Sequence, residues 1–139
     1  MMLYGIRVND LPIVWQKAAT LLKEVNPKKW ESFQKEAGDT QNWESVEDWF
    51  NHYESETYYG IGAFLHDVIK QEEKIQLDLS ESTKNGVCVG IFVKAPWGYD
   101  PSVKNISCPE FKAIINKYVS KIANNDEAYF QWWDMSAGA

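Results

Sequence analysis

The sequence predicts an α+β fold in which a small, mainly antiparallel sheet of about four strands packs against several helices. One observation is the Asn85-Gly86 pair between two runs of alternating apolar residues, which is typical of a β-hairpin turn. Another is the element order: a strand, several helices, a hairpin, a helix and a last strand. This order favours antiparallel pairing with helices on one face over a doubly wound nucleotide fold. The third is a helical stripe with apolar residues at i, i+3, i+4, i+7, i+8 and i+11: Phe111, Ile114, Ile115, Tyr118, Val119 and Ile122.

The N-terminal third predicts a strand followed by two helices. Apolar and other residues alternate over 3–8, as in a strand with one buried face. Asp10 is expected to cap a first helix over 10–25, with Pro12 in its first turn. Asn26 and Pro27 end this helix and start a shorter one before Gly38.

Two further helices are predicted in the middle of the chain. One begins near Ser45, with Glu47 and Asp48 favourable at its N-terminus, and buries Val46, Trp49, Phe50 and Tyr53. Residues 55–59 are expected to break or bend the chain. The next helix follows, although Gly60 and Gly62 weaken its start, and its buried face is Ile61, Phe64, Leu65, Val68 and Ile69.

The remaining strands surround the C-terminal helix. Residues 75–79 and 87–93 are predicted to pair as a hairpin through a turn over 80–86. Residues 87–93 are apolar on both faces, which places this strand in the centre of the sheet. Ser107 and Glu110 have capping-box spacing before the helix, and residues 129–134 are assigned to a last strand.

Composition limits the classes of function. The 139 residues fit one domain over 1–139, the formal net charge is -6, and the sequence pI is about 4.9. Arg7 is the only arginine among 14 basic residues, so direct nucleic-acid binding is disfavoured. An acidic surface suits a basic protein partner, although a modest negative charge also serves solubility alone.

The cysteines and the N-terminus favour the cytoplasm. Cys88 and Cys108 lack C-x-x-C spacing and are expected to be free thiols. Residues 1–8 lack the features of a secretory leader, and the apolar run over 87–93 is too short to span a bilayer. No membrane association is predicted.

No cofactor or metal site is predicted. His52 and His66 are the only histidines and are not spaced as a ligand pair. His52 is interpreted as a solvated helix position and His66 as the flank of a buried helix face; His66 and Asp67, as helix neighbours, are expected to point apart. The Gly60-Ile61-Gly62 segment lacks the rest of a phosphate-binding loop, and Cys108, at a helix start, has no identifiable histidine partner for nucleophilic catalysis.

Residues 43–59 combine acids with aromatic rings. Trp43, Trp49, Tyr53 and Glu54 are the candidate binding residues of this region. Acids among rings are used by glycosidase clefts, in which one carboxyl group has a raised pKa and rings stack on sugar. A solvated helix face over an aromatic core produces the same residue pattern and is the preferred interpretation.

A second aromatic region is the proline-framed loop over 95–101. Trp97 and Tyr99 lie between Pro96 and Pro101, where rigid rings are good interface anchors when exposed. The same rings could fold back and cap the edge of the sheet, and this is the slightly favoured alternative. Both remain candidate binding residues.

The second half of the chain resembles small uncharacterised proteins of Gram-positive bacteria and their phages. The resemblance lies in residues 60–69, 90–97 and 110–118, which are structural rather than catalytic motifs. The resemblance implies a cytoplasmic accessory protein and indicates no active-site residues.

We therefore expect a non-enzymatic protein-interaction module, an inhibitor or regulator of phage-related origin. The alternative is a small enzyme or ligand-binding domain with an aromatic and acidic pocket around residues 43–59. A third possibility is an acidic surface that mimics nucleic-acid phosphate. A deep pocket with two convergent carboxylates would favour the enzyme, and a flat acidic patch bearing rings would favour the module.

Overall fold

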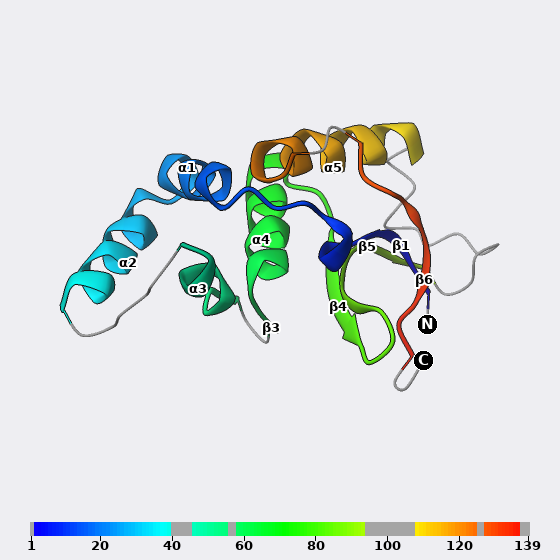
Figure 1. The fold of residues 1–139 in the computed structure, drawn as a ribbon. Coiled ribbons are helices and arrows are strands. Elements are labelled where there is room, and N and C mark those ends of the chain that lie inside the picture. Colours follow the sequence, from blue (N-terminus) through cyan, green and yellow to red (C-terminus); the bar gives the residue numbers. More distant parts are fainter. Residues whose placement is uncertain (1, 40–45, 56–57, 94–107, 125–126, 137–139) are drawn as a thin grey trace.

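The computed structural model of the protein describes residues 2–39, 46–55, 58–93, 108–124 and 127–136. The fold is α+β, as predicted, with helices packed against an antiparallel sheet (Figure 1). In chain order the elements are β1 (Met2–Arg7), the 3₁₀ helix η1 (Val8–Asp10), α1 (Trp15–Val25), α2 (Pro27–Asp39), α3 (Val46–Asn51), β2 (Glu54–Ser55), β3 (Tyr58–Tyr59), α4 (Ile61–Glu73), β4 (Asp78–Ser82), β5 (Gly86–Val93), α5 (Cys108–Ile122) and β6 (Gln131–Asp134).

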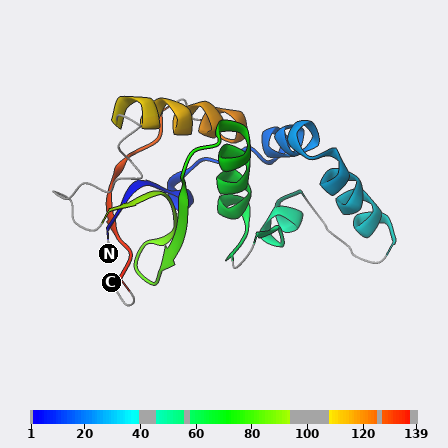
Figure 2. The same cartoon turned by 180° about the vertical axis from the view of Figure 1, so that it is seen from behind.

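The main sheet has the strand order β4-β5-β1-β6, and each neighbouring pair is antiparallel. The predicted hairpin is confirmed as β4 and β5, with Gly86 at a φ of 67° at the end of its turn. β5 lies between β4 and β1, which confirms its central place. The last strand is confirmed as β6, which pairs with β1 and places Asp134 opposite Met2 (Figures 1 and 2).

The helices divide into two groups. α5 lies along the sheet and α4 stands beside it, whereas α1 and α2 extend away from the sheet and α3 lies near the lower end of α4 (Figures 1 and 2). No helix within the described parts of the chain is long and apolar enough to cross a bilayer.

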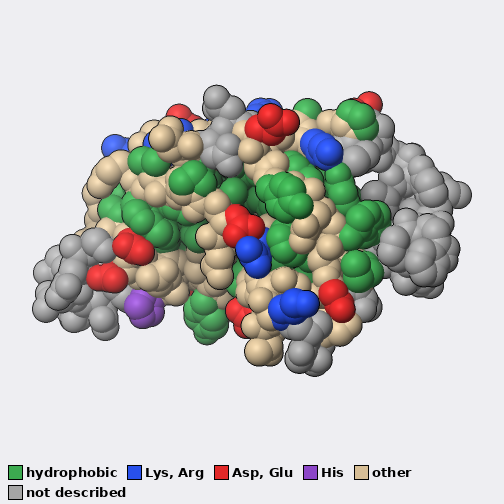
Figure 3. Space-filling view, turned by 45° about the vertical axis from the view of Figure 1, so that its right-hand side comes forward, with side chains coloured by type: hydrophobic (Ala, Val, Ile, Leu, Met, Phe, Trp, Pro, Cys, Tyr) green, Lys and Arg blue, Asp and Glu red, His purple; other side chains and the backbone are tan. Residues whose placement is uncertain are grey.

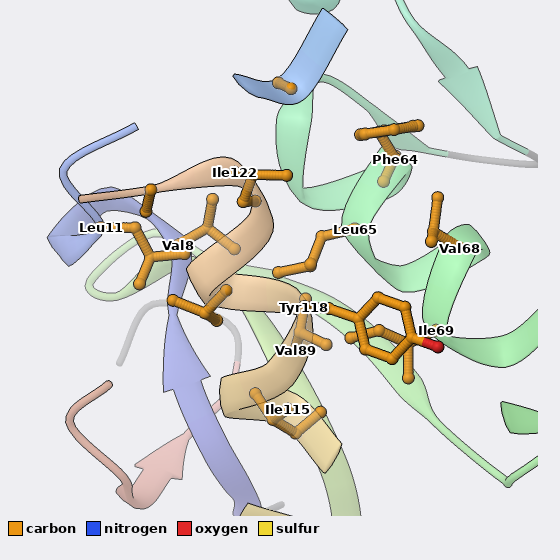
Figure 4. Packing of buried hydrophobic residues seen from close by; sticks show 14 of the residues in the cluster. Val8, Leu11, Phe64, Leu65, Val68, Ile69, Val89, Ile115, Tyr118 and Ile122 are labelled. Atoms are coloured by element: carbon orange, nitrogen blue, oxygen red, sulfur yellow. The ribbon is translucent and has the colours of Figure 1, made fainter. Parts of the chain in front are cut away.

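The predicted stripe of α5 forms part of the main core. Ile115, Tyr118 and Ile122 face Leu65 and Ile69 of α4 (Figure 4). Ile114 is only half-buried, because it lies at the flank of the stripe. Packing between two amphipathic helices and the sheet therefore holds the centre of the molecule.

The first helix begins at Trp15 and not at Asp10, which corrects the predicted cap. Residues 12–14 are extended instead: Val14 donates its backbone N–H to the Ile122 carbonyl at 2.8 Å, and Pro12 accepts from the Asn124 N–H at 3.0 Å. These bonds to the end of α5 replace the first helical turn. The Asp10 carboxylate accepts from the Arg7 guanidinium, with its shortest N–O distance 2.9 Å.

Two other boundaries differ from the prediction. β4 runs Asp78–Ser82 and not 75–79, so residues 80–82, which were predicted as turn, pair with β5 from Ser82 opposite Gly86. The turn is therefore limited to residues 83–85. Ser82 also accepts the Asn85 backbone N–H through its hydroxyl at 3.0 Å, which tightens that turn. Residues 55–59 were predicted only to break the chain, whereas their described part contributes to the two-stranded β2–β3 hairpin.

A pair of facing glycines bends the sheet. Gly5 and Gly90 are opposite each other, and a Cβ on Gly90 would lie 2.8 Å from the Gly5 Cα. Figure 1 shows the β4–β5 hairpin curling toward the end of β6, where the Asn85 side chain donates to the Asp134 carbonyl at 2.8 Å. The curl encloses a second small core made of Leu3, Cys88, Trp133 and Met135.

Cys88 is a free thiol within this small core. Burial raises the pKa of its thiol to about 11, so the group stays protonated and unreactive at neutral pH. The side chain of Cys108 lies outside the described residues, and its free state stays a prediction.

Truncation of Ile115 to Ala should lower the free energy of unfolding by roughly 2–5 kcal/mol, the usual cost of a cavity at a fully buried aliphatic site. Ile115 has 0% exposed surface, at the centre of the α5 stripe. Denaturant melts of Ile115→Ala and of Lys112→Ala, an exposed position on the same helix, provide the measurement. A loss below about 0.5 kcal/mol for Ile115→Ala would show that the stripe is not core.

Substitution of Gly90 by Ala should destabilise the fold by about 3 kcal/mol or more, because the added methyl meets backbone atoms that cannot move independently. Gly62→Ala is the matched control, since its methyl would meet side-chain atoms of Val87 and Val8, at 2.8 and 3.1 Å, and no backbone atom. Thermal melts of both variants compare the two sites. Equal stability of the variants would contradict the bend at Gly90.

Candidate functional site

The structure separates the predicted binding residues into three groups. Trp43, Trp97 and Tyr99 lie outside the described residues. Trp49 and Tyr53 are each 6% exposed and belong to the core. Glu54 is exposed on β2.

The rings of Trp49 and Tyr53 pack inward. Trp49 meets Phe50 with ring centroids 5.0 Å apart, and Tyr53 meets Phe64 at 5.4 Å. These rings offer little surface to a partner. The preferred interpretation of this region, an aromatic core beneath a solvated face, agrees with their burial.

The β2–β3 hairpin presents one acid and one ring side by side. Glu54 pairs with Tyr59, and directly opposite residues of an antiparallel pair project from the same face. Tyr59 is 60% exposed. The Gly60 N–H donates to the Tyr53 carbonyl at 2.9 Å and closes the hairpin; the φ of Gly60 is 102°, a backbone conformation suited to glycine.

The hairpin is attached to α4 through the carboxylate of Asp67. The Ser55 hydroxyl donates to Asp67 Oδ1 at 2.6 Å, and the Tyr53 hydroxyl donates to Oδ2 at 2.9 Å. Lys29 of α2 adds a contact from the other side: its ammonium lies 4.0 Å from the centre of the Tyr53 ring and donates to the Glu54 carbonyl at 3.4 Å. Glu54 and Tyr59 are thus carried by a braced hairpin.

His66 is the third partner of Asp67. Its Nδ1 lies 3.2 Å from Asp67 Oδ1, and its Nε2 lies 2.8 Å from the Leu77 carbonyl oxygen. The expectation that the two neighbours point apart is therefore wrong, because the imidazole and the carboxylate lie within hydrogen-bonding distance. His66 is half-buried at the flank of the buried face of α4, as predicted, and His52 is exposed.

These contacts shift three pKa values. Burial raises the pKa of the Asp67 carboxyl, but hydrogen bonds from His66, Ser55 and Tyr53 outweigh it and leave that pKa below its ordinary value. For His66, burial lowers the pKa, but the bonds to Asp67 and Leu77 outweigh it and the net shift is upward. Burial, aided by the charge of Asp67, raises the pKa of Tyr53 strongly, so its hydroxyl remains a donor.

The cluster contains Ser, His and Asp but lacks the geometry of a hydrolase triad. Ser55 donates to Asp67 and not to the imidazole. Both ring nitrogens of His66 already face acceptors, so neither is placed to take a proton from a serine hydroxyl. The lowered pKa of the Asp67 carboxyl also differs from the raised pKa that a glycosidase general acid needs.

Two hollows lie near candidate residues. One, of about 190 Å³, lies between the hairpin, α4 and β4 and is lined by Ser55, Tyr58, His66, Lys70, Leu77, Asp78 and Leu79. Its lining carboxylate, Asp78, accepts the Phe92 backbone N–H at 2.9 Å. The other, of about 380 Å³, lies beside α5 and has Glu127 as its lining carboxylate. Among the described residues, neither hollow is lined by two carboxylates.

A second group of rings surrounds β6. Tyr129 is 66% exposed and Trp132 is 37% exposed. Trp132 rests on Tyr4 with ring centroids 5.2 Å apart. Figure 3 shows hydrophobic side chains reaching the surface on this side of the molecule, between scattered charges.

Negative charge is concentrated in one part of the chain. Residues 46–82 contain nine acidic residues and two lysines, and the rest of the chain is close to neutral. The exposed acids within this segment include Glu47, Glu54, Glu72 and Glu81. The β2–β3 hairpin lies within the same acidic segment.

No group of three or more His, Cys, Asp or Glu side chains within the described ranges is arranged to hold a metal ion. Comparisons with protein-family models, with curated proteins and with solved structures found no match. The site is therefore interpreted from its own geometry.

Sequence patterns identified Glu54 and Tyr53 but missed Ser55 and Asp67 as a unit. Ser55 and Asp67 are twelve positions apart and belong to different elements, so neither helical nor strand periodicity connects them. The adjacent His66 and Asp67 are the one sequence signal of this cluster, and their i, i+1 spacing on a helix does not by itself predict a contact.

Replacement of Asp67 by Asn should lower the free energy of unfolding at pH 6 by roughly 1–3 kcal/mol, because an amide cannot accept from Ser55, Tyr53 and His66 together. It should also lower the pKa of His66, which loses its anionic partner. Glu54→Gln removes the same charge from the exposed side of the hairpin and serves as the control. Denaturant melts and histidine NMR titration give the two measurements; if both variants behaved alike, Asp67 would not be the attachment point.

Proposed function

We propose that the protein is a small, cytoplasmic, non-enzymatic interaction module, an inhibitor or regulator that binds a basic protein partner through its acidic segment over 46–82. The observation that supports this proposal most directly is the side-by-side exposure of Glu54 and Tyr59 on a hairpin braced by Asp67. The resemblance of the second half of the chain to small proteins of Gram-positive bacteria and their phages supports a phage-related origin.

The physical basis is preorganisation combined with charge. A tyrosine held on a fixed backbone offers a large contact area at low entropic cost. Glu54 opposite the ring and the net negative charge of the segment over 46–82 attract a basic partner and speed its association, an effect that salt weakens. Tyr59 is therefore the proposed anchor, and Glu54 is a charged neighbour at its rim.

The other predicted residues take different roles in this proposal. Tyr53 positions the hairpin through Asp67, and Trp49 supports the Tyr53 ring at a centroid distance of 6.1 Å. Trp43, Trp97 and Tyr99 remain proposed contact residues.

The enzyme or ligand-binding alternative is less well supported. The hollow beside Ser55 and Tyr58 measures about 190 Å³, which is below the roughly 300–1,000 Å³ of ordinary small-molecule sites. The larger hollow lies beside α5, away from residues 43–59.

Removal of the Tyr59 ring should weaken partner binding about thirtyfold, the effect of a loss of about 2 kcal/mol at an interface anchor. The native partner is first captured from cells with the wild-type chain and identified by mass spectrometry, and its affinity is then measured for Tyr59→Ala and Glu54→Lys. Glu54→Lys should mainly slow association and reduce its salt dependence.

Tyr129→Ala is the matched control, because it removes an equally exposed tyrosine outside the acidic segment. Circular dichroism confirms that each variant folds. If Tyr129→Ala abolished binding while Tyr59→Ala bound normally, the interaction surface would be the β6 side and not the acidic segment.

A further inference from the structure

His66 makes contacts that one neutral ring cannot satisfy. Its Nε2 faces the Leu77 carbonyl at 2.8 Å, and its Nδ1 faces Asp67 Oδ1 at 3.2 Å. A carbonyl oxygen only accepts hydrogen bonds. Asp67 likewise accepts here, since the hydroxyls of Ser55 and Tyr53 both donate to its carboxylate.

The number of protons on the ring decides which contacts survive. The imidazolium carries a proton on each nitrogen and satisfies both acceptors. The neutral ring carries one proton. A bond to an ionised carboxylate is stronger than a bond to a neutral carbonyl, so the proton stays on Nδ1. The lone pair of Nε2 then faces the lone pairs of the Leu77 oxygen, and this contact becomes repulsive.

We infer that His66 is a pH-operated latch between α4 and the segment that leads into β4. As an imidazolium it ties the Leu77 carbonyl to Asp67. When it loses its proton it releases the Leu77 carbonyl, while the Leu77 side chain stays buried in the core; Leu77 also lines the 190 Å³ hollow beside the hairpin. The hairpin itself stays attached, because Ser55 and Tyr53 still donate to Asp67.

Several charged and titratable groups act on the ring from the elements around it. Asp67 on α4 favours the imidazolium, whereas Lys70 on the same helix opposes it. Tyr58 lies on the hairpin side and Asp78 on the β4 side of the hollow that His66 lines. Tyr53 influences the imidazole only indirectly, through the hydrogen bond that its hydroxyl donates to Asp67.

The pH range in which the latch is closed follows from the two shifts. The pKa of His66 is raised above its ordinary 6.5, so the stabilisation is complete below 6.5 and is lost as the pH rises through the raised value. The pKa of Asp67 is lowered from its ordinary 3.8, so its contribution is complete above 3.8 and is lost as the pH falls through the lowered value. The latch is closed in mildly acidic solution and opens on the alkaline side.

Opening has a second consequence, which rests on the proposed function. Loss of the proton removes one positive charge from the acidic segment over 46–82. The segment then attracts a basic partner more strongly, so partner association should be faster above the pKa of His66 than below it.

The test follows both histidines of the full chain, without any partner, by long-range ¹H–¹⁵N NMR between pH 5 and pH 9. We expect His66 to be protonated on both nitrogens at low pH and on Nδ1 alone at high pH. The ¹³C shift of the Leu77 carbonyl should follow the same titration. A high-pH ring protonated on Nε2, with an unchanged Leu77 shift, would overturn the latch.

A second readout is the tryptic cleavage rate after Lys74, an exposed residue at the end of α4, normalised to a short peptide substrate. The normalised cleavage rate should rise roughly threefold between pH 6 and pH 8, which is the size of effect expected from the loss of a partly exposed ion pair. His66→Gln should abolish this pH dependence, and Asp67→Asn should move the opening to lower pH. The matched control, His52→Gln, should behave as the wild type; persistence of the pH dependence in His66→Gln would also overturn the latch. Because no partner is present, these results are independent of whether Tyr59 is the anchor.

Discussion

The backbones of β1 and β5 meet at Gly5 and Gly90, where a side chain on either strand would overlap the other backbone. This close approach bends the sheet and brings the tip of the β4–β5 hairpin to the end of β6. The bend leaves one face of the sheet to α4 and α5 and encloses Leu3, Cys88 and Trp133 on the other. The indole N–H of Trp133 donates to the Gly5 carbonyl at 2.9 Å, so the small core also secures the strand that bends.

The region of the candidate site depends on a different interaction, the shared carboxylate of Asp67. Charge-assisted bonds from a serine, a tyrosine and a histidine are stronger than the two ladder pairs of so short a hairpin. An isolated two-stranded hairpin is marginally stable in water. Asp67 therefore gives β2 and β3 a fixed orientation against α4.

Charge and shape point to the same kind of function. The net negative charge of the molecule is concentrated in residues 46–82, a segment that includes the exposed Tyr59. Ser55 and Tyr53 both donate to Asp67, so these polar groups hold the hairpin against α4. A preorganised acidic surface that meets a basic protein is consistent with all of these features.

The sequence by itself determined the elements whose signal is local. The α5 stripe, the Asn85-Gly86 turn and the central position of β5 follow from periodicity and turn chemistry, because burial on one face repeats with the geometry of the backbone. The acidic and aromatic composition of residues 43–59 indicates Tyr53 and Glu54 as candidate residues. It does not indicate that Tyr53 lies in the core and Glu54 on the surface. Only the tertiary structure decided that residues 12–14 bond to the end of α5, that Gly5 faces Gly90, and that Ser55 meets Asp67. These contacts join residues that are distant in sequence. They are stabilised by packing of the whole fold, which no local sequence pattern predicts.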